Sequence, residues 1–324
     1  MRYVIVGPGG IGSALGGRLH QSGHDVVFVA RGANYDALVA NGLRLVSPTS
    51  DDTFPVNVVA TLDGFDLAPD DVVLLAVKSQ DSATVLADLA AAAPTSVAVV
   101  CTQNGVFTEA AAHRYFESVY GAYNFLITSY YMPGVAHVHT SPYWGVIDVG
   151  LASGGEDDVS RAVAAHLRDA SFDSMSRPDV MRWKYAKLLT NLGNAFQAAS
   201  GYTPQIGELI GLAQAEGVDC FEAAGIDFVP DADEGARRDH LLPMQAAGGL
   251  ANVGGSSWQS LARGTGAVET YFLNGEISML GRHFGVPTPV NDAITRIVVN
   301  MARTQTPPGS ITPTDLLTVV AESR

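Results

Sequence analysis

The sequence predicts an α/β domain built on an open parallel sheet, followed by a second domain that is entirely helical. Strands and helices alternate over the first half of the chain, and β signals almost vanish beyond residue 178. The length of 324 residues exceeds what one typical core needs and favours two domains. We place the boundary within 174–178, which gives domains of 1–175 and 176–324.

The first domain begins with a strand, a glycine-rich turn and a helix. Residues 2–6, RYVIV, are apolar and β-branched, as in a buried parallel strand. Residues 13–21 carry helical periodicity, and 24–30, HDVVFVA, predict a second strand. Together these segments form one βαβ unit of the usual length.

Later segments extend this sheet. Strand-like runs at 71–77 and 96–101 flank an Ala-rich helical stretch at 82–93. Between 119 and 149, runs rich in Tyr, Val and Ile predict antiparallel additions to the sheet, and a helix follows at 156–170.

The second domain is predicted to contain helices at 179–200, 206–224 and 262–284. A glycine-rich loop, AGGLANVGG, interrupts them at 247–255. Thr312 followed by Pro313 predicts the N-cap and first position of a last short helix.

Composition excludes several classes of partner. The formal net charge of −14 provides no general attraction for nucleic acid or for an anionic membrane, so an anionic ligand needs local cations. Cys101 and Cys220 stand far apart and predict neither a disulfide framework nor a zinc site. No signal peptide or membrane span is predicted, which favours a cytoplasmic protein.

The first turn, GPGGIG, has the spacing of a dinucleotide-binding loop between a strand and a helix. Gly7 allows the tight turn, Gly9 lets the backbone approach a pyrophosphate, and Gly12 allows close packing of helix on strand. The alternative is an ordinary glycine-rich turn. The residues expected to contact the cofactor are Gly7, Gly9, Gly10, Ile11 and Gly12.

The end of the second strand discriminates between nicotinamide cofactors. An NAD site places an acid there to bond the ribose hydroxyl, whereas an NADP site offers an arginine. Here the strand ends VARG, so Arg31 predicts NADPH, with a plain surface arginine as the alternative.

Four further motifs resemble those of the ketopantoate reductase family, in the same order. They are AVKSQDS (76–82), TQNGV (102–106), WKYAKLLTN (183–191) and SSWQSLARGTGAVETYFLNG (256–275). With the glycine loop, the resemblance covers about residues 1–290. It implies an N-terminal Rossmann-type, NADP-binding domain, a helical domain for substrate and dimerisation, and reduction of 2-dehydropantoate to pantoate with NADPH in pantothenate biosynthesis.

The resemblance also implies the site residues. Lys187 matches the family's catalytic lysine, with Asn191 four residues later, and Glu269 matches its catalytic glutamate. Ser257 matches a substrate-binding serine. Lys78 and Asn104 match the lysine after a strand and the asparagine of the Gln-Asn-Gly turn.

These residue types suit reduction of a 2-oxo acid. A protonated Lys187 can act as general acid to the developing alkoxide, and Glu269 can bond the substrate hydroxyl and keep that lysine charged. Asn104 and Asn191 can orient the substrate, and Ser257 can bond its carboxylate. Asn194, at i+7 from Lys187, is expected on the same helix face.

Three departures from the family pattern all affect the substrate side. Ala195 stands where a second asparagine is common, with Asn194 one residue earlier, and Gly254 replaces a common asparagine. Trp258 stands where a smaller or more flexible residue is usual. The reaction type is therefore predicted more firmly than the substrate.

Other readings stay open. A related hydroxyacid or opine-type dehydrogenase shares the two-domain plan, and a non-catalytic NADPH-sensing protein would keep only the cofactor domain. A homodimer is expected by analogy alone.

His137 and His139 alternate along a predicted strand, but no third metal ligand is near, so we expect structural histidines. Lys184 is expected on the surface, and Trp183 in packing.

Overall fold

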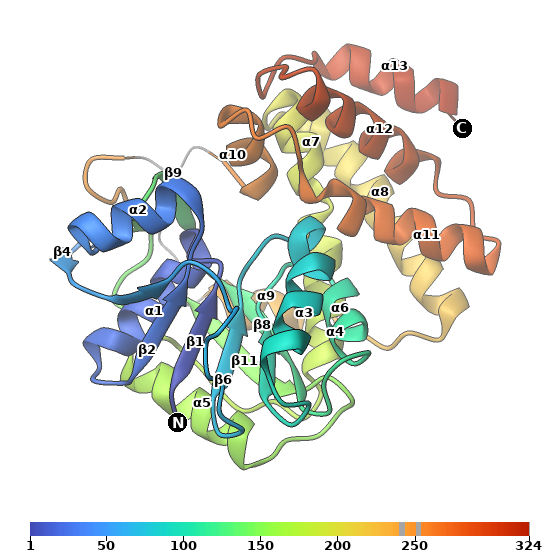
Figure 1. Ribbon diagram of the computed structural model, residues 1–324. Helices are drawn as coiled ribbons and strands as arrows, with labels where there is room; N and C mark the ends of the chain where they lie inside the picture. The colour runs from blue at the N-terminus through green and yellow to red at the C-terminus, as the bar shows by residue number, and fades with distance from the viewer. Residues whose placement is uncertain (240–243, 251–253, 324) are drawn as a thin grey trace. The chain divides into compact units, whose positions relative to one another are not determined.

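The computed structural model describes residues 1–239, 244–250 and 254–323 (Figure 1). The chain divides into two compact units, Met1–Lys184 with Pro230–Asn252, and Tyr185–Val229 with Val253–Arg324. This division differs from a single boundary at residue 175. Residues 176–184 and 230–252 both belong with the first unit.

Within the described residues, the first unit contains a seven-stranded sheet in the order β11-β8-β7-β6-β1-β2-β5. Six of these strands run parallel, and β11 is antiparallel to β8. The strands are β1 (Tyr3–Val6), β2 (Val26–Val29), β5 (Asn57–Val59), β6 (Val72–Leu75), β7 (Ala98–Cys101), β8 (Val119–Phe125) and β11 (Val146–Leu151).

Successive residues of β1 point to opposite faces of this sheet, as strand geometry requires. Tyr3 and Ile5 join a core beneath α1 and α5, whereas Val4 and Val6 join a second core beneath α3. The helices of this unit are α1 (Gly10–Gln21), α2 (Gly32–Asn41), α3 (Ser82–Ala92), α4 (Phe107–Ala112), α5 (Asp158–Asp169) and α9 (Asp231–Asp239), with a 3₁₀ turn η1 (Ser79–Asp81). Both faces of the sheet are thus covered, which explains its continuous apolar strands.

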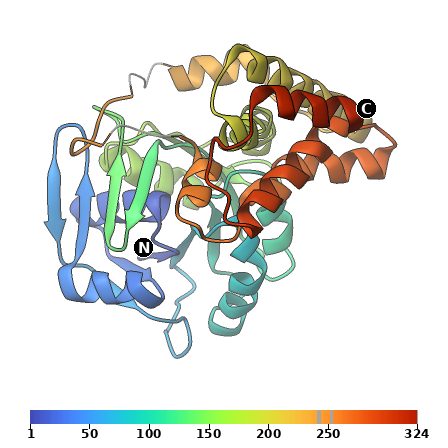
Figure 2. The same cartoon turned by 90° about the horizontal axis from the view of Figure 1, so that it is seen from above.

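A second, four-stranded sheet has the order β4-β3-β10-β9. Figure 2 shows its blue and green strand pairs side by side. Its strands are β3 (Leu43–Val46), β4 (Asp51–Phe54), β9 (Thr128–Met132) and β10 (Val135–Val138). The prediction of antiparallel additions over 119–149 is therefore right only for β11, because β8 runs parallel to β7 and β9 and β10 leave the main sheet.

The segment 230–252 is held to the first unit by ion pairs on α9. The guanidinium of Arg237 donates to Asp148 at 2.8 Å and to Asp173, and Tyr123 donates to Glu234 at 2.8 Å. Asp148, which is fully buried, also accepts from Arg177 at 2.7 Å. A buried carboxylate needs such partners, so α9 is part of this unit's core.

Among its described residues, the second unit contains helices joined by loops and no strand. It contains most of α6 (Val180–Asn191), α7 (Gly193–Ser200), α8 (Pro204–Ala224), α10 (Ser256–Ala262), η2 (Glu269–Phe272), α11 (Asn274–Phe284), α12 (Pro289–Arg303) and α13 (Pro313–Ser323). Figure 1 shows α8, in yellow, packed beside α11 and α12. As predicted, Thr312 caps α13 by accepting from the amide of Asp315 at 3.1 Å.

Two predicted helices are wrong in extent. The stretch 179–200 divides at Leu192 into α6 and α7, where Asn191 and Gly193 are both weak helix formers. The stretch 262–284 divides because Gly264 and Gly266 take positive φ angles of +61° and +73°. Part of the predicted loop 247–255 lies outside the described residues.

Candidate active site

The glycine turn after β1 is held against the neighbouring strand β6. Gly7 has φ +90°, and a Cβ there would lie 2.6 Å from Val77 Cγ1. A Cβ on Gly12 would lie 2.5 Å from the carbonyl oxygen of Gly7. These positions accept only glycine because backbone and helix approach each other so closely.

The rim of the same turn is open. Gly9 is the N-cap of α1, and a Cβ built on it meets no atom within 4 Å. Gly10 packs closely on β9, since its Cβ would lie 2.5 Å from Thr128 Oγ1, and Ile11 is half-buried. An open backbone cradle at a helix N-terminus fits a pyrophosphate, so the residues present suit a dinucleotide.

A residue that sequence reasoning missed supports this turn. Asn34, on α2, donates to the carbonyl of Pro8 at 2.9 Å and accepts from the amide of Gly134 at 2.9 Å. Ser13 donates to the same Pro8 carbonyl at 3.0 Å. Nothing in the sequence marks Asn34, because its partners come from distant turns.

Arg31 is exposed and lies just beyond the carboxyl end of β2, as the N-cap of α2. Because β1 and β2 are parallel and in register, Arg31 and the glycine turn leave the sheet at the same edge. Ligands of open α/β sheets bind at this edge.

Lys78 and Asn104 follow the next two strands of that edge. Lys78 is half-buried and is the N-cap of η1, and the carbonyl of Asn104 accepts from Ser79 Oγ at 3.4 Å. The side chain of Gln103 donates to the carbonyls of Leu75 and Val77 at 2.8 and 3.1 Å. The structure thus joins the two turns that carry Lys78 and Asn104.

In the second unit, Lys187 and Asn191 lie one turn apart on α6, each 8% exposed. Asn194, at the start of α7, donates to Asn191 Oδ1 at 3.4 Å. The Nδ2 of Asn191 is buried and has no hydrogen-bond partner among the described residues. A buried donor of this kind calls for a partner, which a bound water or a ligand can supply.

Ser257 lies on α10, which packs on α7. It is 1% exposed, and its Oγ finds no hydrogen-bond partner in the described part of the chain. Next to it, the amide of Gly255 donates to Gln197 Oε1 at 2.8 Å, and a Cβ on Gly255 would lie 2.9 Å from Asn194 Oδ1. The start of α10 is therefore seated directly on the helix that carries Asn194.

Glu269 is 6% exposed and opens η2. The following helix is anchored by Asn274, whose Nδ2 donates to the carbonyl of Leu192 at 3.3 Å and to Asn291 Oδ1 at 3.0 Å. Asn291 in turn donates to Glu216 at 2.8 Å. This buried chain of hydrogen bonds ties the segment after Glu269 to the break between α6 and α7, and sequence reasoning missed it.

Two of the departures from the family pattern, Gly254 and Trp258, pack against each other. Gly254 has φ +125°, and a Cβ there would lie 2.7 Å from Trp258 Cγ. The far end of the indole lies 3.1 Å from the Cβ position of Gly309. An asparagine cannot replace Gly254 while Trp258 occupies this space, and Ala195 is buried at 2% exposure.

Other predictions concern structural residues. Lys184, expected on the surface, is 3% exposed and forms an ion pair with Glu109. Trp183 packs edge-on against Tyr123 and lies beneath the Arg177 guanidinium, as a packing residue should. His139 is buried and bonds Ser129 Oγ at 2.8 Å, which fits the structural role expected of it.

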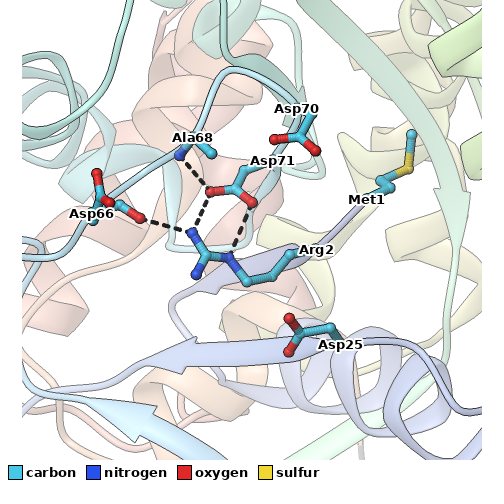
Figure 3. A pocket seen from close by; sticks show the side chains of 7 residues that line it. All are labelled: Met1, Arg2, Asp25, Asp66, Ala68, Asp70 and Asp71. Carbon is cyan, nitrogen blue, oxygen red and sulfur yellow. Dashed lines mark hydrogen bonds and ion pairs between the residues drawn. The ribbon is translucent and has the colours of Figure 1, made fainter.

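The opposite edge of the sheet carries a different pocket (Figure 3). Its lining is Met1, Arg2, Asp25, Asp66, Ala68, Asp70 and Asp71. Arg2 is already bound by Asp71 at 3.0 Å and by the carbonyl of Asp66 at 2.7 Å. With four carboxylates and one neutralised cation, this pocket does not suit an anionic cofactor.

None of the helices in the part of the chain that the structure describes is long and apolar enough to cross a bilayer.

Comparison with known proteins places this arrangement in a family. Residues 3–154 match the family described as Ketopantoate reductase PanE/ApbA, and residues 179–302 match its C-terminal counterpart. The 2-dehydropantoate 2-reductase of Archaeoglobus fulgidus is 29% identical over 308 residues, covering 92% of this chain and 96% of its own. That of Mesorhizobium japonicum is 27% identical and covers 93% and 98%.

Solved structures share the fold. A PanE/ApbA family ketopantoate reductase from Ralstonia eutropha superposes with a TM-score of 0.78 at 24% identity, over 94% of this chain and 99% of its own. D-mandelate dehydrogenase, in a ternary structure with NADH and anilino(oxo)acetate, gives 0.82 at 20% identity over the same shares. With both halves matched, this chain belongs to the ketopantoate reductase PanE/ApbA family and is an oxidoreductase of the kind that acts on a CH–OH group with a nicotinamide cofactor.

Proposed function

We propose that this protein reduces a small 2-oxo acid with NADPH, and that 2-dehydropantoate is its substrate, giving pantoate for pantothenate biosynthesis. The observation that carries the proposal concerns two predicted substrate residues: Asn191 Nδ2 and Ser257 Oγ are among the buried polar atoms without hydrogen-bond partners in the described residues. They lie in the same helical unit as the buried Lys187. A bound 2-oxo acid would give both atoms a hydrogen-bond partner.

The cofactor residues follow from the first unit. The turn of Gly7, Gly9, Gly10, Ile11 and Gly12, which is open at Gly9, would hold the pyrophosphate, with Arg31 on the 2′-phosphate. Lys78 and Asn104 would contact the cofactor farther along the same sheet edge. The bound nicotinamide supplies the hydride.

The second unit supplies the acid and the substrate contacts. Lys187 gives a proton to the oxygen that was the keto group, since an ammonium both stabilises and protonates a developing alkoxide. Glu269 accepts from the substrate hydroxyl and favours the charged form of that lysine. Asn191 and Asn194 of this unit orient the substrate, as Asn104 of the first unit would also do, and Ser257 donates to its carboxylate.

The test is an NADPH-oxidation assay with 2-dehydropantoate and a panel of other 2-oxo acids, with and without amines. Lys187→Met should lower kcat by about 10²- to 10⁴-fold, the usual worth of a positioned general acid, and should leave NADPH binding intact. Tight NADPH binding with no NADPH oxidation across the panel would contradict the proposed reductase activity. It would favour a cofactor-sensing protein instead.

A second candidate is a dehydrogenase for a different 2-hydroxy acid. Trp258 fills the space beside Gly254, so position 254 presents no polar side chain to a substrate, and a fold relative acts on D-mandelate. Turnover of an aryl or branched 2-oxo acid in preference to 2-dehydropantoate would favour this candidate. A homodimer and a cytoplasmic location remain predictions that sedimentation and cell fractionation would test.

A further inference from the structure

The turn after β7 has a run of backbone carbonyls that are all bonded by side chains. The carbonyls of Cys101 and Gln103 accept from Lys184 Nζ at 3.4 and 3.1 Å. The carbonyl of Thr102 accepts from Asn124 Nδ2 at 2.7 Å, and that of Asn104 accepts from Ser79 Oγ at 3.4 Å. Four successive peptide groups are thereby fixed from three directions, all within the first unit.

Lys184 contributes two of these bonds from an unusual environment. Its side chain is 2% exposed, and that of its ion-pair partner, Glu109, is 3% exposed. Burying two charges brings little net stability, because their desolvation offsets their attraction. A pair of apolar residues would fill this space equally well, but could not donate to the two carbonyls.

The direction of these carbonyls decides where the turn presents its amides. Because a peptide group is planar and trans, a carbonyl turned toward Lys184 aims the N–H of the next residue the opposite way. The bond to Gln103 therefore sets the amide of Asn104. The bond from Ser79 sets the amide of Gly105, which adopts φ +87°.

We propose that Lys184, with Glu109 as its counterion, is a positioning residue for Asn104 and its flanking peptide groups. The inference rests on the proposed function, in which Asn104 contacts cofactor and substrate. Lys184 takes no part in the proton transfer, which belongs to Lys187. Because Glu109 neutralises the charge of Lys184, the turn gains two hydrogen bonds from Lys184 without gaining a net charge.

A double-mutant cycle tests this role. Removing Lys184 alone would leave Glu109 buried and unpaired, so both are replaced, as Lys184→Met/Glu109→Met, in the full-length protein. This variant, Asn104→Ala and the triple variant are compared with the native chain for NADPH Kd by fluorescence titration and for kcat/KM with the 2-oxo acid. Thermal melting confirms that each is folded.

The double variant should weaken NADPH binding or kcat/KM by about tenfold or more, as misplacement of a contact residue does. Asn104→Ala should then add little in that background, because the two changes disrupt the same contact. Fully additive losses would overturn the proposal, as would an Asn104→Ala variant with native Kd and kcat/KM.

A matched control removes an ion pair from the other end of the strands. Arg2→Met/Asp71→Asn, at the edge shown in Figure 3, should leave the NADPH Kd unchanged. If the native protein binds NADPH but reduces no 2-oxo acid, the proposed function fails. The coupling in NADPH Kd still decides the role of Lys184.

Discussion

Arg31 is the exposed side chain that we propose selects NADPH over NADH. It leaves the sheet at the same edge as the glycine turn and stands where an acid would select NADH. Its position follows directly from the strand that precedes it, so the sequence alone was sufficient to place it. Its role depends on a phosphate that only one of the two cofactors carries.

Arg31→Ala should therefore weaken NADPH binding and leave NADH binding nearly unchanged. A charged hydrogen bond contributes about 1.5–3 kcal/mol, which corresponds to roughly a tenfold to hundredfold change in Kd. Fluorescence titration with both cofactors measures the effect. Arg44→Ala, which removes another exposed arginine of the same unit, is the control, and an equal loss for both cofactors would refute the assignment.

Residues with distant partners could not be predicted in this way. Lys184 was expected at the surface because lysine is rarely buried, and its partner Glu109 lies on another helix far away in the sequence. Asn274 and Asn291 bond each other across two helices for which no local pattern predicts contact. Sequence reasoning recognises a residue's chemistry, but only the fold supplies its neighbours.

At the scale of elements, the strand-turn-helix of residues 3–21 is the part most fully predicted. Its strand, its turn and its helix each carry a local signal. Gly12 makes its close contacts within that segment or with the turn after β6, Gly7 with the turn after β6, and Gly10 with β9. The glycines differ, however, in what surrounds them. Substitution of one glycine should therefore affect the stability of the protein, and substitution of another should affect NADPH binding.

Gly12→Ala should destabilise the protein by about 1–3 kcal/mol, as an overpacked methyl group does, because its Cβ would meet the Gly7 carbonyl. Gly9→Ala should cost at most about 1 kcal/mol, since its Cβ enters open space at a helix N-cap. It should nevertheless weaken NADPH binding at least about tenfold, because the methyl group would occupy the phosphate cradle.

Urea unfolding and NADPH titration of both variants separate the two effects. Native NADPH affinity in Gly9→Ala would show that the turn has only a structural role. Similar unfolding midpoints for Gly12→Ala and the native protein would show that the helix can move away from Gly7.

The smaller sheet was predicted poorly for a physical reason. Alternating apolar residues indicate a strand, but they do not indicate its partner. Here β10 pairs in parallel with β3, about ninety residues earlier, and β4 is a run of polar residues, DDTF. The helix break at Leu192 could not be predicted for the same reason, since it depends on a distant partner. The carbonyl of Leu192 accepts a hydrogen bond from Asn274, which lies on another helix.

At the scale of the whole molecule, two units were predicted, but the return of 230–252 to the first unit was not. The ion pairs that hold α9 join Arg237 to carboxylates at 148 and 173, which no local signal connects. The kind of reaction was predicted from the resemblance to a family, whose motifs recur here in the same order, and not from hydrophobic periodicity. It did not supply the packing of Trp258 on Gly254.

The stability of the first unit should depend on pH through His139. Burial lowers the pKa of this histidine below its usual value of 6.5. The unfolded chain therefore takes up a proton as pH falls below 6.5, while the folded chain does not, so stability decreases toward acid pH. In His139→Gln, which can still bond Ser129, the urea midpoint should fall less between pH 7.5 and pH 5.5.

The native protein and His139→Gln are compared at both pH values, with the exposed His113→Gln as control. His137 and His166 also have lowered pKa values, so part of the acid sensitivity should persist in the variant. Identical midpoint shifts in the native protein and His139→Gln would contradict the assignment.

The return of α9 also has a consequence for how the chain is made. A ribosome releases the parallel sheet long before Arg237, and Asp148 must wait for that arginine while α6, α7 and α8 emerge. Until then, the partners available to the Asp148 carboxylate are Arg177 and the backbone amide of Met175. The first unit therefore lacks one of its ion-pair partners until α6, α7 and α8 have been synthesised.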